Sequence, residues 1–460
     1  MIDIVLNHTA NNSEWIQEHP EACYNVDDVP RLYPAYLLDA TLGAVSAEFS
    51  RGGVPWCRSA PYLNNEQDLG QVVAEMTRRA RSLNLHEFFL CDFDQQAFMS
   101  ALPGLPQQQV AAKVEEFKRS GLFEMEPGQV LRKHFLEKLG QGPARRQVTL
   151  KQPDTAIFFA ALCHQNVTVA MQKAEQLVQE SNRHWTATVT RWVDEAMENC
   201  RGTMRYFKLE LKRNHITDRN YLLDPYFSTL SNAKQSKVVH NGWIADHNPL
   251  VDFALEQDFP YLRRQVNIWG DSIKLRYGDC PASSPYLWDH MSRYVTQMAT
   301  LFDGFRLDNA HSTPMHVCQY MLQVARCQKP DLFVMAELFT SSAEMDALFT
   351  TRLNINGMIR EIMNKGDTAS VGAYFHEITC REAVLGKLDT DFESVHEPNQ
   401  DGSANTYKVL MPTKPSDVIY DQTHDNPSPL MKFGTRRLAL PTIGLLGLAD
   451  QIIASTWGYD

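Results

Sequence analysis

The sequence has little that would tie the protein to a membrane, a nucleic acid or an oxidising compartment. Its 460 residues carry a formal net charge of −11 and contain no long basic run, which argues against nucleic acid or an anionic membrane as the main partner. The most apolar late stretch, 438–455, is interrupted by Pro441 and Asp450, so no membrane-spanning helix is expected. A neutral substrate is compatible with this charge balance.

Cysteine spacings typical of disulfide frameworks or metal sites are also missing. The 9 cysteines are odd in number and scattered, and no two of them form a C-x-x-C pair. This distribution favours reduced thiols over a disulfide framework or a zinc site. The short apolar start of the chain is interrupted by Asp3, Asn7 and His8, so we expect no secretory signal and a cytoplasmic protein.

A helix followed by a strand is predicted over 287–308. Apolar residues recur at three- and four-residue steps over 287–302, which predicts an amphipathic helix. Gly304 then leads into a predicted strand over 305–308. Because alternate residues of a strand share a face, Arg306 and Asp308 should point to the same side.

The next segment repeats this design and ends on Glu337. Thr313 is the expected N-cap of a second helix, and Pro314 its first residue. The apolar run 332–336 then predicts a strand buried on both faces of a parallel sheet. Asp308 and Glu337 should therefore lie at the C-terminal ends of neighbouring parallel strands. In a (β/α)8 barrel, active sites are built at that end of the strands.

A single carboxylate after a strand is more often a helix cap or a solvated loop residue than a catalytic group. Arg306 favours a functional interpretation, because a guanidinium on the same strand face stabilises the ionised carboxylate that a nucleophile needs. Asp308 and Glu337 are therefore the candidate pair for chemistry.

Other segments give weaker predictions. Short strands are expected at 1–8 and 418–426, ending in Asn7 and His8 and in His424 and Asp425 respectively. A short helix is expected at 343–349, a weak strand or a helix at 354–363, and a last strand at 451–457. The polar stretch 393–406 suggests an exposed loop.

The long segment 13–279 is expected to be mostly helical. Helical spacing extends over 65–83, 107–139 and 155–204. The stretches 241–243 and 269–271 contain turn-forming residues beside tryptophans. Stacking of these tryptophans on a sugar and packing at a rim are both open.

Four polar blocks end the predicted strands in chain order: Asp3 with Asn7 and His8, then Arg306 with Asp308, then Glu337, then His424 with Asp425. Their order resembles the four motif regions of the α-amylase superfamily, glycoside hydrolase family thirteen. Those regions contain D-x-x-x-N-H, G-F-R-x-D, a Glu that ends a strand, and a late H-D. A closer resemblance is to the 4-α-glucanotransferase part of the eukaryotic glycogen debranching enzymes. The segments that carry it are 7–10, 240–243, 269–272, 311–314, 336–340 and 423–426.

The resemblance implies an α/β fold, the (β/α)8 TIM barrel of the α-amylase type. In that family the first motif region ends the third strand, so we expect a barrel that lacks its first two strands and is formed by 1–12 and 280–460. Residues 13–279 would then be a large, mainly helical insertion after the third strand. The amylo-α-1,6-glucosidase domain of these enzymes would follow beyond Asp460.

The resemblance also implies the roles of individual residues. Asp308 would be the nucleophile that forms a covalent glycosyl-enzyme, Glu337 the acid/base, and Asp425 a third acid that binds sugar hydroxyls. The residues expected to bind substrate are Asn7, His8, Arg306, His311 and His424. No metal and no cofactor are implied. The implied partners are glycogen or another branched α-1,4/1,6-glucan and maltooligosaccharides, with neither nucleic acid nor membrane.

The implied reaction moves a maltooligosaccharide segment between α-1,4-glucan chains with retention of configuration. The same residues acting with water would give an α-amylase-type hydrolase, and an incomplete barrel could leave an inactive, glucan-binding fragment. A secreted amylase is disfavoured by the missing signal and the unpaired cysteines. A transporter-associated heavy chain with the same barrel is disfavoured by the missing membrane anchor.

Overall fold

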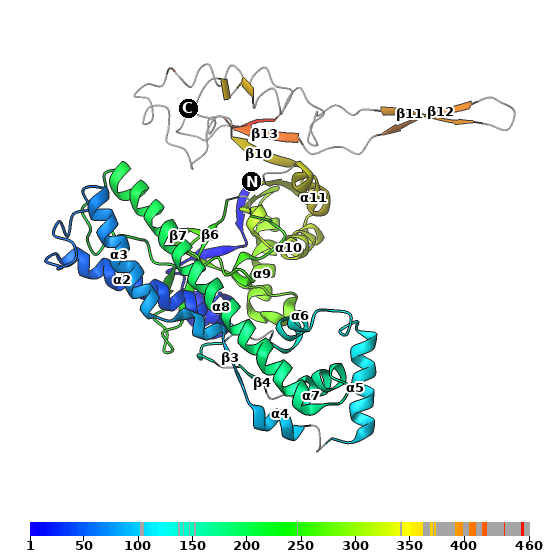
Figure 1. Cartoon of the computed structure of the whole chain (residues 1–460). Coiled ribbons are helices and arrows are strands. Elements are labelled where there is room, and N and C mark those ends of the chain that lie inside the picture. The colour runs from blue at the N-terminus through cyan, green and yellow to red at the C-terminus, as the bar shows by residue number, and fades with distance from the viewer. Residues whose placement is uncertain are drawn as a thin grey trace. The chain divides into compact units, whose positions relative to one another are not determined.

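The computed structural model describes residues 1–101, 105–136, 139–140, 142–146, 148–150, 153–245, 247–340, 343–361, 369–370, 372–373, 392–398, 404–410, 416–420, 437 and 452–454. The chain divides into two compact units. The first comprises Met1–Thr9, Ala245–Asp252 and Leu275–Asp460, and the second Ala10–Ile244 and Phe253–Lys274. Figure 1 labels their helices and strands.

The first unit contains a six-stranded parallel sheet in which each strand pairs with the next one along the chain. The strands, in order, are β1 (Ile2–Val5), β8 (Gly304–Asp308), β9 (Phe333–Ala336), β10 (Gly357–Glu361), β13 (Ser416–Tyr420) and β14 (Ile452–Ala454). Phe305 and Leu307 of β8 and Val334, Met335 and Ala336 of β9 are buried, as expected for strands covered on both faces. The strands predicted at the two carboxylates are thus confirmed, and the ambiguous segment near 354–363 forms a strand.

Helices separate the first strands of this sheet, and these are α9 (Pro285–Leu301), α10 (Met315–Gln328) and α11 (Ala343–Leu353). The periodic segment 287–302 indeed forms α9, which buries Leu287, Met291 and Val295. The predicted cap of α10 is wrong, because Pro314 takes the N-cap position and the Thr313 hydroxyl donates to the Asn309 carbonyl at 3.3 Å.

The expected exposed loop over 393–406 is also wrong. Strands β11 (Phe392–Pro398) and β12 (Ala404–Leu410) form an antiparallel pair there (Figure 1). The pair Val395 and Tyr407 lies directly across the two strands. The polar composition of this stretch is the reason why it was interpreted as a loop.

The second unit is built mainly from helices. They are α1 (Glu14–Glu18), α2 (Tyr33–Arg51), α3 (Glu66–Ser82), α4 (Gln95–Ala101), α5 (Gln107–Arg119), α6 (Pro127–Val130), α7 (Pro153–Leu162) and α8 (Val167–Met204). Asn65 and Asn166 cap α3 and α8 through side chains that accept a main-chain N–H three residues on. Among the described residues, no helix is both long and apolar enough to cross a membrane.

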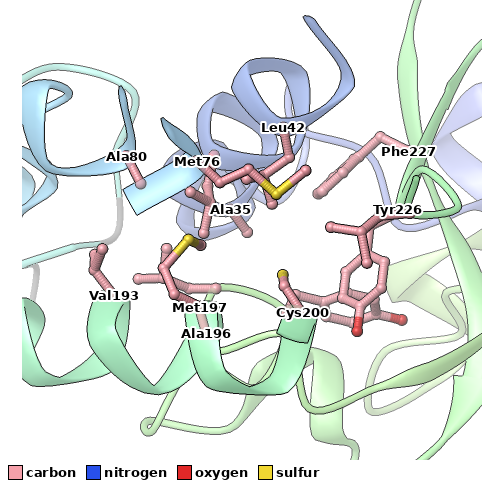
Figure 2. Packing of buried hydrophobic residues seen from close by; sticks show 14 of the residues in the cluster. Ala35, Leu42, Met76, Ala80, Val193, Ala196, Met197, Cys200, Tyr226 and Phe227 are labelled. Atoms are coloured by element: carbon pink, nitrogen blue, oxygen red, sulfur yellow. The ribbon is translucent and has the colours of Figure 1, made fainter. Parts of the chain in front are cut away.

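The core of the second unit forms around the C-terminal half of α8. Val193, Ala196, Met197 and Cys200 follow one another at three- and four-residue steps and are all buried. Figure 2 shows these side chains facing Met76 of α3 and residues of α2, with Tyr226 and Phe227 beside them.

Short strands complete the second unit. A four-stranded sheet has the order β2 (His8–Ala10), β7 (Asn267–Lys274), β6 (Lys237–Trp243) and β5 (Phe227–Thr229), in which β5 pairs with β6 and β6 with β7 in antiparallel orientation. β3 (Cys91–Phe93) pairs in parallel with β4 (Val148–Leu150). The stretches 241–243 and 269–271, predicted as turns, lie inside β6 and β7 instead. Gly242 is required by close strand approach, because an added Cβ would lie 2.3 Å from the Asn267 carbonyl oxygen.

A buried ion pair ties α2 to the segment before β7. The guanidinium of Arg264 donates to the Asp39 carboxylate, and both side chains are almost fully buried. Asp39 also accepts the main-chain N–H groups of Tyr226 and Phe227. The carboxylate is therefore saturated with donors, which is the condition under which a buried charge is tolerated.

Candidate active site

The two candidate carboxylates follow neighbouring strands at the same edge of the parallel sheet. Leu307 pairs with Ala336 in the β8–β9 ladder, and the Glu337 N–H donates to the Leu307 carbonyl at 2.9 Å. Asp308, at the end of β8, and Glu337, directly after β9, are thereby brought to one edge. The predicted placement of this pair on adjacent strand ends is confirmed.

Arg306 contacts three carboxylates at once. Its Nη1 lies 2.8 Å from Asp3 Oδ1 and 3.4 Å from Asp308 Oδ1, while its Nη2 lies 3.3 Å from Glu337 Oε1. Arg306 and Asp308 do share a strand face, as the alternation predicts. One guanidinium therefore contacts both members of the candidate pair.

The environment of Arg306 is largely shielded from water. The side chain of Arg306 is 12% exposed and that of Glu337 6%, whereas that of Asp3 is 53% exposed. Burial by itself lowers the pKa of Arg306, but the carboxylates of Glu337, Asp3 and Asp308 outweigh it, so the pKa is raised above its ordinary value. The guanidinium is a permanent positive charge at this site.

Asn309 also contacts both carboxylates, and the sequence analysis did not single it out. Its main-chain N–H donates to Glu337 Oε2 at 2.9 Å, and its side-chain Nδ2 donates to Asp308 Oδ2 at 3.1 Å. The residue adopts a left-handed conformation with φ 45° and ψ 45°. The available signal was the residue type, because Asn tolerates this conformation better than most side chains.

Asn7 and His8 follow β1, the strand next to β8. Asn7 is 2% exposed, and its Oδ1 lies 2.7 Å from His8 Nδ1. Because an amide oxygen only accepts, Nδ1 of His8 carries the hydrogen in this contact. The same Nδ1 lies 4.0 Å from Asp308 Oδ2. The structure therefore places His8 beside the candidate nucleophile, whereas the buried Asn7 contacts His8.

His311 lies in a short 3-10 turn, η8 (Ala310–Ser312), directly after Asn309. Its Nδ1 is 3.5 Å from the Glu337 carbonyl oxygen and 3.4 Å from the Phe339 N–H, and its ring packs against that of Phe339. Burial lowers the pKa of His311, and the contact with the Glu337 backbone offsets part of this effect. His311 is therefore neutral at pH 7 and is held by the segment that carries Glu337.

Two predicted site residues, His424 and Asp425, lie outside the described residues. Within the described ranges, no group of three or more His, Cys, Asp or Glu side chains could hold a metal ion. The described site thus offers two carboxylates at a strand edge, a shared guanidinium and two imidazoles. Such a set can supply a nucleophile, an acid/base and donors to hydroxyl groups.

Comparisons with known proteins identify a family and a curated relative. The family model described as "Glycogen debranching enzyme, glucanotransferase domain" matches residues 1–333. The chain is 31% identical over 500 residues to the "Glycogen debranching enzyme" of Saccharomyces cerevisiae, an alignment that covers 100% of this chain and 31% of the yeast protein. The chain therefore spans about a third of the length of that relative.

Two solved structures show more limited similarity. The α-amylase of Geobacillus thermoleovorans, solved with acarbose, is 18% identical with a TM-score of 0.19, over 26% of this chain and 29% of that chain. The type III pullulan hydrolase of Thermococcus kodakarensis is 17% identical with a TM-score of 0.19, over 34% of this chain and 32% of that chain.

Proposed function

The chain belongs to the family of glycogen debranching enzyme glucanotransferase domains, and from this premise we propose that it is a 4-α-glucanotransferase that moves maltooligosaccharide segments between α-1,4-glucan chains. The observation that carries the proposal is the single guanidinium of Arg306 set between Asp308 and Glu337 at adjacent strand ends. Two carboxyl groups flanking one glycosidic bond are what retaining glycosyl transfer requires.

In the first half of the proposed reaction, an oxygen of Asp308 attacks the anomeric carbon of the donor glucan. The bond from that carbon to the leaving oxygen breaks, and Glu337 gives its proton to that oxygen. Arg306 stabilises the ionised form of Asp308 before the attack, because the guanidinium lies 3.4 Å from the attacking carboxylate. The product of this half is a covalent glycosyl-enzyme and a shortened glucan.

In the second half, the 4-hydroxyl of an acceptor glucan attacks the same carbon and gives its proton to Glu337, and the bond to Asp308 breaks. Glu337 must therefore alternate between two protonation states. Its two oxygens face the Arg306 Nη2 and the Asn309 N–H in the structure, and both contacts favour the ionised form. Protonation of Glu337 therefore acts against both contacts.

The remaining site residues would bind the donor. His8 and His311 would donate hydrogen bonds to sugar hydroxyls, and Asn7, being buried, would act by orienting His8. We also propose that Asp425 is the third acid and that His424 contacts the same sugar, on the strength of their match to the family motif. No cofactor enters these steps.

We further propose that the sheet of the first unit belongs to a (β/α)8 barrel of the α-amylase type. Its residues would be 1–12 and 280–460, with 13–279 as the insertion. Glycogen and maltooligosaccharides in the cytoplasm would be the partners. The six parallel strands in chain order support the barrel, because that order is the one found in (β/α)8 proteins.

The test is incubation of the purified protein with maltopentaose and separation of the products by size. A ladder of longer and shorter oligosaccharides is expected from the wild type and not from Asp308→Asn or Glu337→Gln. Asp303→Asn is the matched control, because Asp303 precedes the same strand but is 96% exposed and pairs with Lys329. Shorter products alone would indicate a hydrolase, and an unchanged ladder in Asp308→Asn would contradict the assignment.

A further inference from the structure

Asn309 donates to both candidate carboxylates, to one through its main chain and to the other through its side chain. The main chain contacts Glu337 and the side chain contacts Asp308, at 2.9 Å and 3.1 Å. Arg306 also spans the pair, but its long side chain has several rotatable bonds. The Asn309 N–H is part of the backbone and the amide is one bond from Cβ, so these contacts fix positions more tightly.

We infer that Asn309 is a positioning residue that sets the separation and orientation of Asp308 and Glu337. Its side-chain amide stabilises the ionised carboxylate of Asp308 and holds it in the orientation needed for attack. This inference rests on the proposed function, in which those two carboxylates act together. It assigns to Asn309 a role distinct from that of Arg306. Arg306 supplies a positive charge, whereas Asn309 fixes the relative positions of the two carboxylates and supplies a neutral hydrogen-bond donor.

The left-handed conformation is what makes the arrangement possible. After β8 ends, the turn at Asn309 directs two successive N–H groups toward Glu337, since the N–H of Ala310 donates to the Glu337 carbonyl at 3.0 Å. The same turn begins η8, which places the His311 ring against the Glu337–Phe339 backbone. A β-branched or bulky residue would be strained here, while Gly, Asn and Asp are tolerated.

Substitution of Asn309 by each of the other two tolerated residues separates the contribution of the backbone turn from that of the side-chain amide. Gly keeps the turn and the main-chain bond to Glu337 but removes the amide donor to Asp308. Asp keeps the turn and nearly the same shape but replaces the donor with an acceptor that opposes Asp308. A role confined to the backbone therefore predicts that Asp and Gly are equally tolerated, whereas a donor role predicts that Asp is worse.

Several charged and titratable groups bear on the pH dependence. Among the residues that the structure describes, they include Asp3, His8, Arg306, Asp308, His311 and Glu337, together with Asp346, whose carboxylate acts on His311. Arg306 remains positive throughout, so it partly offsets a new carboxylate at 309 at every pH. The repulsion between residues 308 and 309 in Asn309→Asp should therefore be moderate, and it should disappear when the carboxylates take up protons at low pH.

The first experiment compares maltopentaose transfer by wild type, Asn309→Gly and Asn309→Asp across pH. We expect kcat to fall about tenfold for Asn309→Gly, since one charge-assisted bond is lost, and about 100-fold for Asn309→Asp, since the nucleophile is also displaced. The acid limb of the pH profile should move to higher pH in Asn309→Asp. KM should change less than kcat, because the amide contacts Asp308 and not the sugar.

The second experiment does not depend on activity and so separates this inference from the proposed function. The melting temperature of Asn309→Asp relative to wild type is measured from pH 4 to pH 8, and the deficit should grow as the pH rises. Asn309→Gly should show a smaller deficit that rises less steeply with pH, because it removes the donor to the ionised Asp308 without adding a second charge. Asn354 provides the matched control, because it is also left-handed at φ 49° but exposed, so Asn354→Asp should show no such dependence.

The two experiments have clear outcomes. A larger kcat loss for Asp than for Gly, with a pH-dependent melting deficit only at 309, supports the inference. An inactive wild type with the same melting behaviour would overturn the proposed function and leave the positioning of Asp308 by Asn309 standing. Equal effects of Asp and Gly at 309, or Asn309→Asp behaving as wild type in both assays, would overturn the inference.

Discussion

Replacement of Arg306 by Met should destabilise the protein strongly, because it removes the only described cation in contact with three carboxylates. The side chains of Asp308 and Glu337 are 18% and 6% exposed, so both carboxylates would lose their contact with a cation while remaining partly desolvated. Removing one partner of a buried ion pair costs about 3–5 kcal/mol. Asp3, at 53% exposed, should add little, since water screens it.

The pH dependence of this effect can be worked out from the same contacts. The pKa of Arg306 is raised above its ordinary value, so its stabilising effect is fully present below the unfolded-state pKa and is lost only as the pH rises through the folded-state pKa at the strongly alkaline end. At the acid end the penalty of Arg306→Met should shrink as the pH falls toward about 4, because the stranded carboxylates can take up protons.

The assay is calorimetric melting of Arg306→Met, Arg306→Lys and a surface control, at pH 4, 5.5 and 7.5. Arg293→Met is the control, because Arg293 and its partner Asp289 are both 68% exposed and should contribute about 0–1 kcal/mol. Arg306→Lys should fall between wild type and Arg306→Met, since it keeps the charge but cannot span two carboxylates. If Arg306→Met melted like Arg293→Met at pH 7.5, the reasoning would be refuted.

Three further predictions concern buried polar groups and thiols. Asp39→Ala should cost about 3–5 kcal/mol by stranding the buried Arg264, and Asp39→Asn less, with chemical denaturation as the measurement and equal losses as the contrary result. Because burial lowers the pKa of His311 below 6.5, the folded protein should lose stability as the pH falls from 7.5 to 5, and His311→Gln should flatten this loss in melting curves; parallel curves would contradict it. A thiol reagent should modify the exposed Cys280 and Cys327 in the native protein, whereas Cys91 and Cys318, whose pKa values burial raises to about 12, should react only after unfolding; mass spectrometry of the labelled peptides distinguishes these outcomes.

The candidate pair could be predicted from the sequence because local pattern and topology agree there. Two short apolar runs each end on a carboxylate, and a predicted helix separates them. This pattern leaves few alternatives to two adjacent parallel strands. The spacing of Arg306 and Asp308 then places both on one face. These are short-range rules, and the pairings of β1, β8 and β9 follow them.

Contacts that depend on conformation or on distant segments could not be predicted in this way. The left-handed turn at Asn309 changes which groups face Glu337, and residue type alone does not reveal it. Gly242 was interpreted as a turn residue, although it is required by the approach of Asn267 from a strand 25 residues later in the chain. Thr313 was expected to cap α10, but its hydroxyl is taken by the Asn309 carbonyl of the preceding turn.

The central claim is that Asp308 forms a covalent bond to the transferred sugar. Its most direct test is to incubate the protein with an activated maltooligosaccharyl fluoride whose fluorinated sugar slows the second half-reaction, and to map the modified peptide by mass spectrometry. We expect one glycosyl group on the peptide that contains Asp308, and none in Asp308→Asn. A sugar attached to another carboxylate, or rapid turnover with no covalent adduct at any time, would contradict the account.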